Sequence, residues 1–248
     1  MAKSAALEDL WNSAPPAQAF FDPPNIAQFP EPVRRYLMHA IARGTPLASA
    51  VRIRMHGEIK LKRWYPFSAE QVVCWPRGFI WQAVMRMGAL TVRGSDRFVD
   101  GHGAMRWKFF GVVPLITASG LDITRSAAGR VNIECIWLPA VLCGEKIAWS
   151  ALDDSHIRAS FTAHGESAAI DLAIDPSGAP TSVRMPRWGN PEGSLFHYAE
   201  FGGFLENEAT FSGYTIPTRL RVGWHFGSSD FEPEGEFFRA AIDSATYK

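Results

Sequence analysis

Hydrophobic and polar residues alternate along most of this chain with the period of two that is typical of β-strands. Residues 51–61, VRIRMHGEIKL, show the pattern most clearly, with aliphatic residues on one face and mainly charged residues on the other. Such a strand buries one face and exposes the other, as strands of antiparallel sheets do. Looser versions of the pattern predict strands at 79–87, 104–110, 156–163, 167–174, 181–185, 196–201, 206–211, 218–226 and 236–243.

These segments predict a mainly β fold built on one large antiparallel sheet. We expect about eleven or twelve strands, at the spacing of roughly 8–12 residues that is typical of sandwiches and barrels. Helical patterns do not alternate with the strands, which argues against a parallel α/β sheet. A single sheet of this size normally curls and must cover its apolar face, so we expect a half-barrel or barrel.

Residues 121–142, LDITRSAAGRVNIECIWLPAVL, are the mid-chain segment whose pattern predicts a helix. The segment is apolar on nearly all sides over its second half, which indicates a buried helix. A proline inside a helix removes a backbone hydrogen bond, so Pro139 should end the regular part at about Leu138. We expect this helix, at about 121–138, to cover the apolar face of the curled sheet.

Residues 1–45 predict an N-terminal helical arm that precedes a single domain at 46–248. A short helical pattern is followed by a proline-rich connector and then by a second helix, PEPVRRYLMHAIARG, at 30–44. Glu31 and Pro32 suit the first turn of that helix, and Gly44 suits its end.

The charge of the chain is balanced, with 25 basic and 25 acidic residues. This balance argues against nucleic acid or an anionic membrane as a general electrostatic partner. The three cysteines show no CxxC spacing, so neither a disulfide framework nor a zinc site is predicted. No stretch approaches the ~20 apolar residues of a membrane span. Because acids and prolines stand where a signal peptide has an apolar run, we expect a cytoplasmic protein.

Arg130 and Glu134 are two charges on one side of the apolar helix, in line with Trp137. An isolated buried charge is very costly, so both need partners. One hypothesis is that they pair with each other or with the sheet and hold the helix in place. The other is that Glu134 faces a cavity as a general acid or base with a raised pKa, while Arg130 orients a carboxylate or carbonyl of the ligand.

The tryptophans favour an apolar cavity beside this helix. Trp81, Trp107 and Trp224 fall on the apolar faces of their strands, and Trp137 lies on the helix. Four indoles can form a solid core or line a pocket for a flat or apolar ligand. We favour the pocket, because a cup of this size is difficult to fill with side chains alone.

Tyr198 is a further predicted ligand-binding residue, and Glu200, Asp100, His102 and His156 are weaker candidates. Tyr198 and Glu200 share a strand face with Phe196, so both are predicted to face the cavity. Asp100 and His102 belong to a glycine-flanked DGHG turn, where hairpin formation competes with an acid/base or metal role. His156 follows two aspartates in another predicted hairpin.

Several well-known catalytic motifs are missing from the sequence. It contains no GxGxxG after a strand, no Walker loop, no GxSxG and no HExxH. We therefore expect neither a nucleotide cofactor nor serine-hydrolase chemistry, and no cofactor at all. The scattered histidines predict no metal site.

Some longer stretches carry a family resemblance. They are FPEPVRRYL (29–37), GEI (57–59), DGHGAMRWK (100–108), the RxxxExxWxP pattern (130–139), SGYTIPT (212–218) with Trp224, and FFRAAIDSATY (237–247). Together they resemble an uncharacterised bacterial family of domains of unknown function. The resemblance implies an open half-barrel similar to that of lipoprotein carriers, with an antiparallel sheet wrapped around helices.

The sequence thus predicts binding of an apolar or aromatic small molecule in a barrel cavity. The main hypothesis is a cofactor-independent acid/base enzyme, a lyase, isomerase or hydrolase, that uses Glu134 with Arg130. The alternative is a carrier or binding protein without catalysis for a lipid-like ligand.

Overall fold

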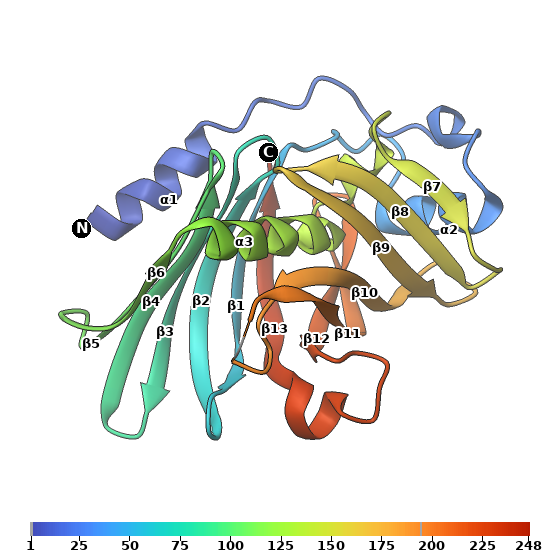
Figure 1. Ribbon diagram of the computed structural model, residues 1–248. Helices are drawn as coiled ribbons and strands as arrows, with labels where there is room; N and C mark the ends of the chain where they lie inside the picture. Colours follow the sequence, from blue (N-terminus) through green and yellow to red (C-terminus); the bar gives the residue numbers. More distant parts are fainter. Residues whose placement is uncertain (1, 194) are drawn as a thin grey trace.

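Thirteen strands form one antiparallel sheet in the computed structural model, which describes residues 2–193 and 195–248 (Figure 1). They are β1 (Ala50–Lys60), β2 (Trp64–Cys74), β3 (Gly78–Met87), β4 (Leu90–Val99), β5 (His102–Phe109), β6 (Val113–Ser119), β7 (Ala148–Ala151), β8 (His156–Ala163), β9 (Glu166–Ile174), β10 (Pro180–Gly189), β11 (His197–Phe211), β12 (Tyr214–Trp224) and β13 (Glu236–Tyr247). The expected eleven or twelve strands are therefore slightly too few.

The sheet consists of two meanders joined in its middle. Strands β1 to β6 follow one another to one edge, and β7 to β13 return from the other edge until β13 pairs with β1. The sheet curls but does not close, because within the described residues β6 and β7 each pair with one strand only. The predicted mainly β fold with one curled antiparallel sheet is confirmed, and it takes the form of a half-barrel.

One strand differs from its prediction because of two glycines. The segments expected at 196–201 and 206–211 are a single strand, β11, with Gly202 and Gly203 near its middle. A Cβ atom on Gly202 would lie 2.4 Å from the carbonyl oxygen of Val183, and one on Gly203 would lie 2.2 Å from that of Arg221. The glycines therefore let the strand pass close to both neighbours, and they interrupt the alternation of large side chains that would reveal a continuous strand.

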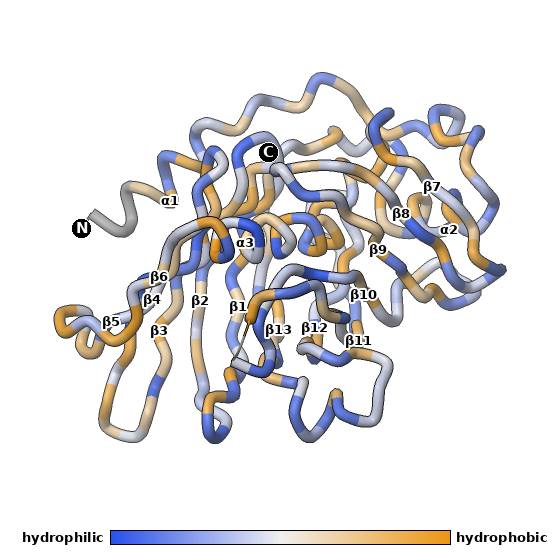
Figure 2. Tube along the Cα trace, viewed as in Figure 1, coloured by the Kyte–Doolittle hydropathy of each residue, from blue (hydrophilic) through white to orange (hydrophobic). Residues whose placement is uncertain are grey.

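The alternation pattern did not predict four of the strands, namely β2, β4, β6 and β7. The second half of β2 is buried on both faces, because helix α1 (Ala2–Asn12) packs on its outer side. Strand β6 shows the opposite pattern, since nearly all its side chains are exposed at the sheet edge although many are apolar (Figure 2). In both cases the two faces of the strand meet the same environment, so no alternation is required.

The connection between the two edge strands crosses the concave side of the sheet (Figure 1). It contains α3 (Leu121–Ile133) and two 3₁₀ helices, η2 (Glu134–Trp137) and η3 (Pro139–Cys143). Residues 131–140 are all buried, as predicted for the covering helix, whereas the first two turns of α3 are exposed or half-buried. The α-helix ends at Ile133 and not at Leu138, because the chain tightens into η2 before it reaches Pro139.

The N-terminal segment contributes two further helices and a short 3₁₀ turn. Helix α1 covers β2 and β3, and α2 (Glu31–Ala40) packs against β7, β8 and β12 after η1 (Pro23–Ile26). Helix α2 is shorter than the predicted 30–44, because Ile41 leaves it to form a β-bridge with Tyr214. The division at residue 45 stays a prediction. No helix of the described residues is long and apolar enough to cross a membrane.

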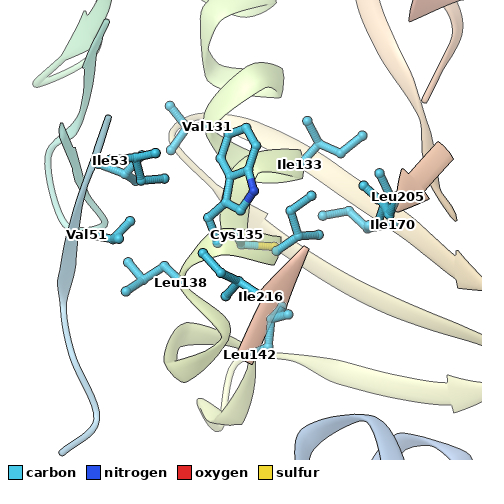
Figure 3. Packing of buried hydrophobic residues seen from close by; sticks show 14 of the residues in the cluster. Val51, Ile53, Val131, Ile133, Cys135, Leu138, Leu142, Ile170, Leu205 and Ile216 are labelled. Carbon is cyan, nitrogen blue, oxygen red and sulfur yellow. The ribbon is translucent and has the colours of Figure 1, made fainter. Parts of the chain in front are cut away.

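The connection between β6 and β7, residues 120–147, is called the crossing segment below. The main core lies between its buried part and the sheet. Figure 3 shows side chains of α3, η2 and η3 packed against residues from both meanders. Val51 and Ile53 come from β1, while Ile170, Leu205 and Ile216 come from β9, β11 and β12. The segment thus holds the two halves of the sheet together, because it buries apolar surface against each.

Candidate functional site

A cavity of about 520 Å³ lies between the crossing segment and the concave face of the sheet. Its wall is mostly apolar and includes Phe79, Phe201, Phe237 and Phe238. The polar side chains on the wall include Asp96, Arg130, Glu134 and Arg187. Both the volume and the mixture of many apolar groups with a few polar ones are typical of small-molecule sites.

Three of the four predicted tryptophans lie on this wall. They are Trp81 on β3, Trp137 on η2 and Trp224 on β12. Trp224 has room because a glycine faces it: a Cβ atom on Gly189 would lie 2.1 Å from its Cη2 atom. Trp107 is not on the wall but packs against Trp81, with 5.7 Å between ring centroids.

Arg130 and Glu134 are joined in a buried network, as one of the two hypotheses predicted. The Nε atom of Arg130 donates to Oε1 of Glu134 at 2.7 Å. Gln71 donates to Oε2 of Glu134 at 2.6 Å and accepts from Nη2 of Arg130 at 3.2 Å. Both oxygens of Glu134 therefore already accept a hydrogen bond, and its side chain is 10% exposed.

Asp96 completes this network from β4. One of its oxygens lies 3.3 Å from Nη1 of Arg130, and the other accepts the indole N–H of Trp107 at 3.0 Å. Burial raises the pKa of Asp96, although Arg130 and Trp107 oppose this. Burial also disfavours the charged form of Arg130, but the two carboxylates outweigh it and raise the pKa of Arg130. The arginine therefore stays charged between them.

Arg187 is a cavity residue that our reading of the sequence missed. In the sequence Arg187 is next to Trp188, so stacking of its guanidinium on that indole is the structural role we expect from the sequence. In the structure Trp188 is instead covered by Arg125, at 3.7 Å from the guanidinium carbon to the ring centroid. Arg187 points inward and is 9% exposed. The sequence did contain a signal for this position. Every second residue from Val183 to Gly189 lies on the buried face of β10, and Arg187 is one of them.

Tyr198 and Glu200 do not face the cavity, so that expectation is wrong. Phe201 and Leu205 take the inward positions of β11, which turns the even-numbered residues at its start outward. The side chain of Tyr198 is 48% exposed and donates to Glu166 at 2.6 Å. Sequence alternation alone did not fix which face of this strand is buried.

The weaker polar candidates lie in surface hairpins, away from the cavity. Asp100 pairs with Arg77 and has a left-handed backbone, while Nδ1 of His102 lies 2.9 Å from the Asp100 carbonyl oxygen. His156 pairs with Asp153 within its own turn. Among the described residues, no three His, Cys, Asp or Glu side chains are arranged to hold a metal ion.

A second, more open depression of about 510 Å³ lies near the start of α3. Its lining includes Asp100, Arg125 and Glu166, and also His164, whose ring packs edge-on against Trp75 and Phe98. Burial lowers the pKa of His164 to about 4. This histidine is therefore neutral at physiological pH, and its packing against two aromatic rings indicates a structural role.

The sequence comparisons identify a family. Residues 27–247 match the model of a family of unknown function, DUF6920. The chain belongs to this family. The resemblance to an uncharacterised family is therefore confirmed, whereas no curated protein matches the sequence.

Two solved structures resemble the fold at very low sequence identity. One is a putative outer membrane lipoprotein-sorting protein domain from Vibrio parahaemolyticus, with 7% identity, a TM-score of 0.43, and coverage of 81% of this chain and 86% of that chain. The other is a LolA superfamily protein from Nitrosomonas europaea, with 10% identity, a TM-score of 0.45, and coverage of 95% and 94%.

Proposed function

We propose that this protein binds an apolar small molecule between the crossing segment and the concave face of its sheet, as a carrier or binding protein. The observation that carries the proposal is the cavity of about 520 Å³, whose wall is built mainly from aromatic and aliphatic side chains. Contact with such a wall removes apolar ligand surface from water, which is the main favourable contribution to binding of this kind.

The state of the polar groups favours binding over acid/base catalysis. A general acid or base needs an oxygen or nitrogen within reach of the substrate. Both oxygens of Glu134 are engaged by Arg130 and Gln71, and both oxygens of Asp96 are engaged by Arg130 and Trp107. These contacts fit a structural role, in which the network holds the end of α3 in place, better than a catalytic role.

The two cysteines between β6 and β7, Cys135 and Cys143, give no support to nucleophilic catalysis. A thiolate is the reactive form of cysteine, and burial in apolar surroundings disfavours it. Burial raises the pKa of Cys143 to about 12 and raises the pKa of Cys135 still further. Both thiols are therefore protonated at neutral pH and act as small apolar side chains.

Titration with N-phenyl-1-naphthylamine, a neutral apolar fluorophore, tests the proposal. The wild-type protein should bind it saturably at one site and quench the emission of the cavity tryptophans. Ala127→Phe, which fills part of the cavity, should weaken binding roughly tenfold or more. The matched control Ala151→Phe, on the exposed strand β7, should bind as the wild type does.

The proposal fails if the wild-type protein shows no saturable binding, or if Ala127→Phe binds the fluorophore as tightly as the wild type. Circular dichroism of each variant, compared with the wild type, verifies that the sheet is intact.

A further inference from the structure

Arg187 is a buried cation without a carboxylate partner. It is 9% exposed, and no Asp or Glu oxygen of the described residues lies within 4 Å of its nitrogens. Its Nε atom donates to the Ser126 carbonyl oxygen at 3.1 Å, and Nη2 donates to the Ser126 hydroxyl at 3.3 Å. Buried charges are normally paired, so this arrangement requires an explanation.

Aromatic rings and the backbone of α3 hold the Arg187 side chain in place. Its guanidinium carbon lies 4.5 Å from the ring centroid of Phe201 and 5.3 Å from that of Trp224. Gly129 of α3 makes room for the stem, because a Cβ atom there would lie 3.0 Å from Cγ of Arg187. The side chain is thus held in one place on the wall by packing and cation–π contacts.

The other charges of the cavity do not satisfy Arg187. Asp96 and Glu134 direct their oxygens to Arg130, Gln71 and Trp107. Burial and the nearby positive charge of Arg130 lower the pKa of Arg187 to about 9, which leaves it charged at neutral pH. A bound anion would offset both the cost of burying this charge and its repulsion from Arg130.

Several hydrogen-bond donors of the wall residues lack an acceptor among the described residues. A guanidinium has five N–H groups, and Ser126 accepts two from Arg187. The indole nitrogens of Trp81 and Trp137, both residues of the cavity wall, are buried and have no acceptor in the part of the chain that the structure describes. A ligand that fits this wall therefore brings oxygen acceptors together with negative charge.

We propose that Arg187 is the head-group site of this cavity and binds the carboxylate of an acidic amphiphile, a molecule with one anionic head and an apolar tail. The planar fork of the guanidinium matches a carboxylate in a bidentate manner. The apolar tail contacts the phenylalanine and tryptophan side chains of the wall. This inference rests on the proposed binding function and names the class of ligand.

Calorimetric titration with two probes of equal tail length tests the assignment: dodecanoate, which is anionic, and 1-dodecanol, which is neutral. The wild-type protein should bind dodecanoate about 10- to 100-fold more tightly, as expected for hydrogen bonds to a charged group. Arg187→Met should lose this preference and keep its affinity for 1-dodecanol. Arg184→Met is the matched control, because Arg184 lies on the opposite face of β10 with a 51% exposed side chain, and it should keep the preference.

The possible results separate the two proposals. Equal affinities of the wild-type protein for both probes, or an unchanged preference in Arg187→Met, would overturn the head-group site and leave the binding function intact. Failure of the wild-type protein to bind either probe or the neutral fluorophore would overturn both. If Arg187→Met does not fold, Arg187→Gln replaces it, since it also removes the charge and should lose the same preference.

Discussion

Replacing Arg130 by methionine tests whether the buried network is a structural element. The substitution keeps an unbranched apolar stem beside Phe79 and Trp81 but removes the only cation that contacts Asp96 and Glu134 among the described residues. Three hydrogen bonds are lost, and two carboxylates whose side chains are 17% and 10% exposed lose their counter-charge.

The expected loss follows from this geometry. Removing one partner of a buried ion pair destabilises a protein by about 3–5 kcal/mol. Gln71 and Trp107 continue to donate to the carboxylates, which places the loss near the lower end, at about 3 kcal/mol at pH 7. Urea unfolding followed by tryptophan fluorescence measures it. The exposed Arg219, 3.9 Å from Glu206, provides a matched control, and Arg219→Met should change the free energy of unfolding by less than about 0.5 kcal/mol.

The pH dependence provides a second, independent test. The pKa of Asp96 is already raised, and it rises further without Arg130. A carboxyl whose pKa is raised in the folded state destabilises that state increasingly as the pH rises from the unfolded-state pKa to the folded-state pKa, and fully above it, because only the unfolded state gains from deprotonation in that range. The difference between Arg130→Met and the wild type should therefore shrink as the pH falls from 7 to 5. A loss below about 1 kcal/mol at pH 7, or a difference that grows on acidification, would refute the structural role of the network.

Three further outcomes are expected. Gly189→Val should push Trp224 into the cavity and weaken binding of N-phenyl-1-naphthylamine about tenfold or more, as measured by fluorescence titration. The wild-type protein should lose stability between about pH 6.5 and 4, because its unfolded state protonates His164 while the folded state keeps it neutral; in His164→Asn, which tolerates the left-handed backbone, this slope should decrease by up to about 1.4 kcal/mol per pH unit in urea unfolding. Glu236→Gln should lower the free energy of unfolding by about 1.5–3 kcal/mol at pH 7, because Glu236 is buried and bonded to Arg221. Its pKa is lowered to about 2, so this difference should fade as the pH drops below about 4.5.

Local patterns predicted the elements whose two faces meet different environments. Strand β1 was predicted nearly residue for residue, because its polar face is largely open to solvent and its apolar face is buried. The four-residue spacing of Arg130 and Glu134 likewise predicted their contact. Helical geometry fixes that distance and needs no information from the rest of the chain.

Tertiary contacts decided what local patterns did not. Gln71 and Asp96 join the network from β2 and β4, strands far from Glu134 in the sequence, so their roles depend on the curl of the sheet. Tyr198 was misplaced because its strand begins after a loop, where alternation cannot fix which face is buried. Arg187 could have been recognised as the one charged position on an apolar face, had β10 been extended beyond Met185.

The pairing of the first and last strands has a consequence for how the chain folds. Each meander forms by contacts between neighbouring strands, which close short loops and carry a small entropic penalty. Pairing Val51 with Tyr247 instead brings together the two ends of the sheet-forming chain. Because such non-local pairings slow folding, we expect the seam between β1 and β13 to form late. Until it does, the crossing segment can pack against only one half of the sheet. The cavity therefore forms only when the fold is complete.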